Sequence, residues 1–162
     1  MAARDSKSKK ASVASCKSKS QPDLTNPVFY LDKCLGNHDV RTALEDVGAI
    51  VQLHTDHFEQ DAEDQHWLPI VGQRGWIVLT KDRHILVNQI EVVALLRSGT
   101  ASFILKSADM TGKDMGQAFA KAHTDMVRMI QRKPMPFIAT ITKAGTVKYV
   151  HGYDGLQRKL RQ

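Results

Sequence analysis

Short apolar runs alternate with longer amphipathic stretches along most of the chain. The runs at 28–31, 49–53, 76–79 and 102–105 contain no charged residue, which is typical of buried strands. Apolar positions recur at helical spacing over 37–47, 62–74, 85–96 and 111–131, whereas 54–61 is polar and predicts a loop. Two alternating stretches, 137–142 and 146–150, flank Ala144 and Gly145 and predict a β-hairpin.

This order of elements predicts an α/β fold: a parallel sheet covered by helices on both faces, with a C-terminal β-hairpin. Ligands of such sheets bind beyond the carboxyl ends of the strands. The flanks differ from this body. Residues 1–26 predict a disordered, basic Ser/Lys-rich tail, residues 27–150 the folded domain, and residues 151–162 a basic C-terminal tail.

The net charge of +6 over 162 residues suggests an anionic partner at first sight. However, residues 1–20 carry +5 and residues 155–162 carry +3, which leaves the intervening body at −2. The basic character therefore belongs to the two ends. The body is slightly acidic and has no excess of basic residues with which to bind an anion.

Composition also excludes several classes of protein. No apolar run approaches the roughly 20 residues that span a bilayer, and the N-terminus lacks the apolar stretch of a secretory signal. Cys16 and Cys34 cannot form a disulfide framework or a zinc site. We therefore expect a cytoplasmic protein without a membrane partner.

Three aspartates are expected at the carboxyl edge of the sheet. Asp32 ends the first strand, Asp82 follows the third, and Asp64 lies at the entry of the second helix. Clustered carboxylates repel one another, and a hard divalent cation such as Mg²⁺ or Mn²⁺ relieves that repulsion. From the residues alone an alternative stays open, in which Asp64 interacts with its helix dipole and the other two cap loops.

Four segments resemble the PIN-like nuclease domains, in particular those related to the VapC-type toxins of bacterial toxin–antitoxin systems. They are residues 29–36 (FYLDKCLG), 64–68 (DQHWL), 75–82 (GWIVLTKD) and 136–139 (PFIA), and the similarity covers about residues 27–150. The combination of Leu-Asp, Asp-x-x-Trp-Leu and Thr-x-Asp, in this order and spacing, carries the resemblance.

The resemblance implies a metal-dependent endoribonuclease, in which a metal-activated water cleaves RNA phosphodiesters. Asp32, Asp64 and Asp82 would be catalytic and would bind Mg²⁺ or Mn²⁺, with Asp109 as a candidate fourth metal ligand. Thr80, Lys81 and Arg83 are candidates for substrate binding. An antitoxin protein and a homodimer are the partners implied besides RNA.

Two other functions stay open. The missing clear fourth acid allows a catalytically weak or inactive PIN-like module that binds RNA or protein. A phosphatase or receiver-like domain of similar layout would use a phosphorylated Asp32, with Lys106 as the late-strand lysine.

Overall fold

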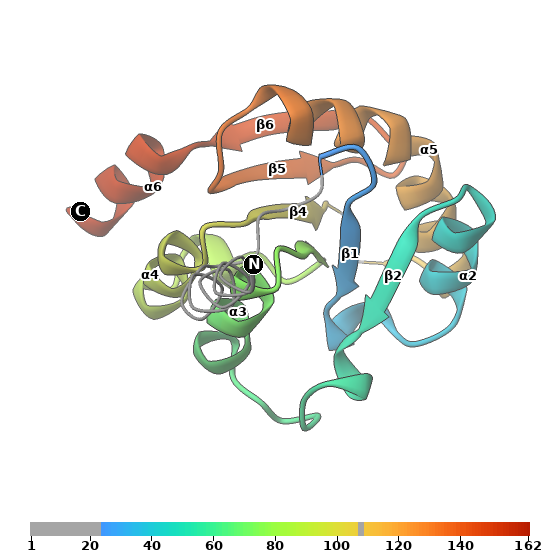
Figure 1. Cartoon of the computed structure of the whole chain (residues 1–162), viewed down its shortest axis with the longest axis horizontal. Coiled ribbons are helices and arrows are strands. Elements are labelled where there is room, and N and C mark those ends of the chain that lie inside the picture. Colours follow the sequence, from blue (N-terminus) through green and yellow to red (C-terminus); the bar gives the residue numbers. More distant parts are fainter. Residues whose placement is uncertain (1–23, 107–108) are drawn as a thin grey trace, which may run out of the picture.

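The computed structural model describes residues 24–106 and 109–162, which form one sheet with helices on both faces (Figure 1). Its strands are β1 (Val28–Leu31), β2 (Ile50–Leu53), β3 (Ile77–Thr80), β4 (Ala101–Leu105), β5 (Phe137–Ile141) and β6 (Val147–His151). They lie in the order β2-β1-β3-β4-β5-β6, and all are parallel except β6, which pairs antiparallel with β5. The predicted fold class and C-terminal hairpin are thereby confirmed.

The helices divide between the two faces of the sheet. They are α2 (Asp39–Asp46), α3 (Asp64–Gln73), α4 (Gln89–Ser98), α5 (Gly112–Arg132) and α6 (Tyr153–Leu160). Helices α2 and α5 pack together on one face, while α3, α4 and α6 cover the other. Three short 3-10 turns follow β1, β2 and β3: η2 (Lys33–Leu35), η3 (His54–Asp56) and η4 (Arg83–Leu86).

The apolar runs are continuous because both faces of the central strands are covered. In β1, Phe29 and Leu31 pack into the core beneath α2 and α5, whereas Tyr30 packs into the core beneath α3 and α4. All three side chains are almost completely buried. A strand buried on both faces loses the alternation that would mark a half-exposed strand.

Two segments differ from the sequence prediction. The helical spacing over 85–96 covers two elements, because η4 ends and the Asn88 side chain then caps α4 by accepting from the Ile90 amide at 2.9 Å. Residues 153–160, predicted as part of a basic tail, form α6. Its Leu156 is fully buried and its Leu160 packs partly buried against the same core. Two leucines among polar and basic residues were too weak a pattern to predict a helix.

The loop predicted over 54–61 begins with a buried histidine. His54 is 1% exposed, contacts the Tyr30 hydroxyl through Nδ1 and lies 2.9 Å from the Glu59 carbonyl through Nε2. A polar residue is buried here because both of its ring nitrogens have partners.

The N-terminal tail, with Cys16, lies outside the described residues up to residue 23. The chain is described from Leu24, whose carbonyl accepts a hydrogen bond from the Gln131 side chain at 2.9 Å. Among the helices of residues 24–106 and 109–162, none combines the length and the apolar character needed to cross a membrane.

The strand order reverses direction between β1 and β3. The chain passes from β1 outward to β2 and then returns to place β3 on the other side of β1. A crevice opens at such a switch point beyond the carboxyl ends of the two strands. Asp32 and Asp82 follow the two strands that flank it.

Gly72 sets how closely α3 approaches α4. A Cβ atom at this position would overlap the backbone carbonyl of Ser98 at the end of α4. We expect Gly72→Ala to lower the free energy of unfolding by about 1–3 kcal/mol, because rigid backbone has to move apart. Urea unfolding measures this, with the exposed Gln73→Ala as the control on the same helix. Equal midpoints for Gly72→Ala and the wild type would contradict the close approach.

Candidate active site

Asp32 is held at the end of β1 with its carboxylate buried. Its backbone amide donates to the Leu79 carbonyl at 3.0 Å, which continues the pairing of β1 with β3. The residue is only 4% exposed. Oδ2 accepts a hydrogen bond from the Thr80 hydroxyl at 2.8 Å, whereas Oδ1 is buried without a partner. A buried carboxylate oxygen left unpaired is costly unless a cation or another donor meets it.

Thr80 and Cys34 fix the direction of this carboxylate. The Thr80 hydroxyl oxygen also accepts from the Asp82 backbone amide at 3.0 Å, so one side chain links Asp32 to the turn after β3. The Cys34 thiol lies 3.4 Å from Asp32 Oδ2. Burial, together with the charge of Asp32, raises the pKa of Cys34 to about 11, so the group is a neutral thiol at neutral pH.

Asp82 caps the turn that follows β3. Its Oδ1 accepts from the His84 backbone amide at 2.9 Å and lies 2.7 Å from His84 Nδ1. The Thr-x-Asp sequence thus has a local structural reason: the threonine orients Asp32, and two residues later the aspartate fixes η4.

Asp64 enters the same region from the first turn of α3. Its Oδ1 accepts from Trp67 Nε1 at 3.0 Å, and Trp67 is itself buried in the core. Burial raises the pKa of Asp64 to about 6, with further contributions from the charges of Asp32 and Asp82. Asp64 therefore lies near enough to Asp32 and Asp82 to be affected by their charges.

Glu91, in the first turn of α4, is an acid that the sequence analysis missed. Its Oε1 accepts from Asn88 Nδ2 at 3.3 Å, and its Oε2 is buried without a partner. Burial raises the pKa of Glu91 to about 6, and the charges of Asp64 and Asp82 add to the shift. The available sequence signal was the pair Asn88 and Glu91, a helix cap with an acid three residues on, just after Thr-x-Asp.

These acids surround one cavity of about 440 Å³ at the carboxyl edge. Its lining includes Asp61, Glu63, Asp64, Asp82 and Glu91, together with Lys33 and Asn88. Asp32 is buried and is not among the lining residues, but its charge acts on Asp64, which is one of them.

The other predicted site residues lie away from the cavity lining. Asp109 is exposed between β4 and α5, next to residues 107 and 108, which are not described. Arg83 is exposed on η4, and Lys81 is half-buried with its backbone amide 3.4 Å from Cys34 Sγ. Lys106 is exposed after β4. Thr80 is 1% exposed and contacts Asp32, so its surroundings suit a positioning role.

The donor set fits a hard divalent cation. Carboxylate oxygens are the ligands that Mg²⁺ and Mn²⁺ prefer, and Asp32 Oδ1 and Glu91 Oε2 are buried and unpaired. Among the described residues, no three His, Cys, Asp or Glu side chains already stand close enough to form a complete metal centre. A bound ion with retained water ligands would bridge the remaining distances.

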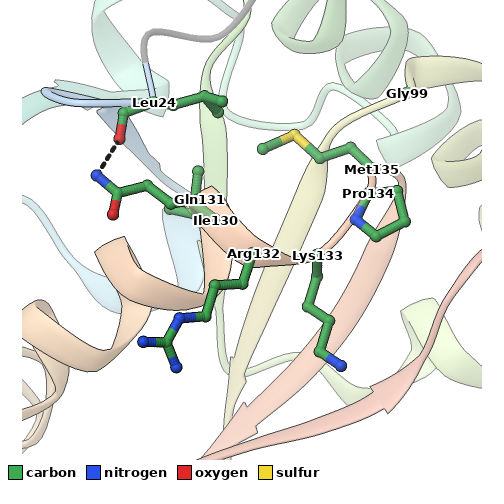
Figure 2. A pocket seen from close by; sticks show the side chains of 8 residues that line it. All are labelled: Leu24, Gly99, Ile130, Gln131, Arg132, Lys133, Pro134 and Met135. Carbon is green, nitrogen blue, oxygen red and sulfur yellow. Dashed lines mark hydrogen bonds between the residues drawn. The ribbon is translucent and has the colours of Figure 1, made fainter.

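A larger cavity, of about 510 Å³, lies at the opposite edge of the sheet (Figure 2). It is lined by residues that precede β1, β4 and β5, including Leu24, Gly99 and Met135. Arg132 and Lys133 extend from it to one side, and none of its lining residues is acidic. Size therefore does not identify the site; the clustered carboxylates do.

Comparison with known proteins places the chain among PIN-like domains. The family described as "PIN like domain" matches residues 27–107, which include Asp32, Asp64, Asp82 and Glu91. A protein of Mycobacterium tuberculosis (strain ATCC 25618 / H37Rv) named "Putative ribonuclease VapC45" is 26% identical over 124 residues, covering 74% of this chain and 89% of that protein. No solved structure matches the chain.

The raised pKa of Asp64 predicts how stability changes with pH in the absence of divalent ions. The folded protein binds a proton at this carboxyl near pH 6, whereas an unfolded chain does so near pH 4. The contribution of Asp64 to the free energy of unfolding therefore falls as pH rises from about 4 to above 6.

We accordingly expect Asp64→Asn to stabilise the metal-free protein at pH 8 and to have little effect at pH 4.5. Asparagine keeps the acceptor for Trp67 and removes the charge. Since the carboxyl is partly open to water, we expect a gain of only about 1 kcal/mol, or about 2–4 °C in Tm. Thermal unfolding at the two pH values measures it, with the exposed Asp46→Asn as control. A loss of stability at pH 8 would contradict the raised pKa of Asp64.

Proposed function

The chain belongs to the PIN-like domain family, and from this premise we propose that it is a metal-dependent endoribonuclease. The observation that carries the proposal is the set of four acids, Asp32, Asp64, Asp82 and Glu91, gathered at the switch point of the sheet. Two of them have raised pKa values, and two of their oxygens are buried without partners. Such a cluster has an excess of negative charge in the place where this fold binds ligands.

Each acid has its own support in the chain. Thr80 orients Asp32, the Trp67 indole holds Asp64, and the η4 turn fixes Asp82. We propose that these three residues hold Mg²⁺ or Mn²⁺, and that Glu91 is the fourth acid in place of the predicted Asp109. A bound ion of this kind supplies an activated water and offsets charge on a phosphodiester. Asp32, being the most buried, would anchor the ion, while the outer acids line the path of the substrate.

The name of the mycobacterial relative supports RNA as the substrate. We further propose that the chain is the toxin of a toxin–antitoxin pair, acts in the cytoplasm and is held inactive by an antitoxin protein. The resemblance to VapC-type toxins and this relative support that assignment.

A second candidate function is an inactive PIN-like module that binds RNA or protein. One observation favours it: in the part of the chain that the structure describes, the acids line a common cavity without three ligands in immediate contact range. Such a module would bind RNA equally well with and without a chelator, and it would show no turnover.

We expect the wild type to cleave single-stranded RNA in the presence of Mn²⁺ or Mg²⁺, and not in the presence of a chelator. Asp32→Asn and Asp82→Asn should each lower the rate by about 100-fold or more, because each removes a charged oxygen donor. Gel analysis of labelled RNA measures this, with Asp46→Asn as the matched control. Equal rates in the wild type and in both site variants would overturn the proposal, since the cleavage would then come from a contaminant or another site.

The fourth acid can be assigned by comparing two variants. We expect Glu91→Gln to lower the cleavage rate by about 10- to 100-fold, and by more than Asp109→Asn does, because Glu91 lines the cavity and Asp109 does not. Both variants keep the size of the side chain and remove its charge. The reverse order of effects would return the role to Asp109.

A further inference from the structure

Lys33 is a cation among acids at the candidate active site. The cavity lining contains five acidic residues and a single basic one, Lys33. The lysine directly follows Asp32, as the first residue of η2, so the same strand end that buries the carboxylate presents the ammonium group at the surface.

Among the described residues no ion pair joins the ammonium group to these acids, although its charge opposes part of the rise in the pKa of Asp64. Among the described residues its recorded contact is with the Gln60 backbone carbonyl, to which Nζ donates at 2.8 Å. The ion pairs of the described chain lie elsewhere, and none includes Lys33. A lysine has three N–H donors, and this contact uses one. Gln60 thus holds the charge at the rim without neutralising it.

This placement matters because an RNA phosphate has to enter a region of negative charge. The lining carries five acids against one cation, and the buried Asp32 adds a further negative charge. A single divalent ion would leave that region negative. A phosphate arriving there needs a positive group that is free to turn toward it, and in the lining only Lys33 provides one.

We propose that Lys33 binds a non-bridging oxygen of the RNA phosphodiester held at the acid cavity. The ammonium would exchange a contact with a neutral carbonyl for a charge-assisted hydrogen bond to the phosphate. Its long side chain allows this movement while Asp32 and η2 stay in place. The inference rests on the proposed function, because it takes the acid cavity to be the place where RNA is held.

Lys33 has another conceivable role, as an anchor for the loop that carries Gln60. Two variants separate the roles. Lys33→Gln can still donate to the Gln60 carbonyl but carries no charge, and Lys33→Arg keeps the charge. A phosphate contact requires the charge, so Lys33→Arg should resemble the wild type and Lys33→Gln should not. If Lys33 only anchored the loop, Lys33→Gln would bind RNA as the wild type does.

The experiment measures the Kd of a short, labelled single-stranded RNA by fluorescence anisotropy in Ca²⁺, a hard cation that takes carboxylate ligands. Measurements at several salt concentrations give the slope of log K against log salt. We expect Lys33→Gln to raise the Kd about fivefold to tenfold and to reduce the slope by about 0.7, the value for one lost phosphate contact on a single strand. Lys143→Gln, in the exposed turn between β5 and β6, is the matched control and should leave both unchanged.

Cleavage of the same RNA in Mn²⁺ separates this inference from the proposed function. RNA binding that depends on Lys33, without any cleavage by the wild type, would overturn the nuclease and keep the phosphate contact. Cleavage by the wild type with an unchanged Kd and salt slope in Lys33→Gln would overturn the phosphate contact and keep the nuclease. A wild type that does not bind RNA would overturn both.

Discussion

The buried Asp32 carboxylate is the constraint on which the rest of the site depends. It is fixed by the register of β1 against β3, since its amide continues the pairing to the Leu79 carbonyl and its side chain meets Thr80 from the neighbouring strand. The Thr80 hydroxyl oxygen also accepts from the Asp82 backbone amide at 3.0 Å, which fixes the position of Asp82. The Asp82 side chain in turn caps η4. A change in register by one residue would turn these side chains to the opposite face. The pairing of the strands therefore positions the centre of the site, and the turns and helix starts that follow the strands supply the remaining acids.

The acids are assembled at a cost to stability. Burial, and after it the charges of the neighbouring acids, raise the pKa values of Asp64 and Glu91 to about 6. At neutral pH the folded protein therefore keeps two carboxylates charged in surroundings less favourable than those in the unfolded chain. The core can carry this cost because the central strands are buried on both faces. Functional sites are where such unfavourable arrangements persist, because binding of the ligand relieves them. The unpaired oxygens of Asp32 and Glu91 are consistent with a cation as that ligand.

How far the sequence predicted the molecule depends on whether the information was local. Buried parallel strands leave apolar runs, so the sheet, its order of elements and the positions of Asp32 and Asp82 at strand ends followed from the pattern. Glu91 was missed because it lies within an amphipathic stretch and follows no apolar run. Lys33 directly follows Asp32, but nothing in the local sequence shows that its side chain lines the same cavity; only the packing of α4 and η2 at the switch point brings the two residues there. Helix α6 was missed because the segment is short and rich in polar and basic residues, and only Leu156 is fully buried, with Leu160 partly buried beside it. The burial of His54 likewise depends on Tyr30, 24 positions away.

The net charge of +6 does not describe the candidate active site, because the charges are distributed unevenly over the molecule. At one edge of the sheet, the cavity beyond the carboxyl ends is acidic apart from Lys33; at the other, Arg132 and Lys133 border a cavity with no acid in its lining. The basic residues of the chain are therefore not gathered where the acids are. General attraction of a polyanion acts over about a Debye length and does not select a point on the protein surface. Under the proposed function, selection of one phosphate would come from short-range groups at the acid edge. The described groups that could provide it there are the carboxylates, through a cation, and the ammonium of Lys33.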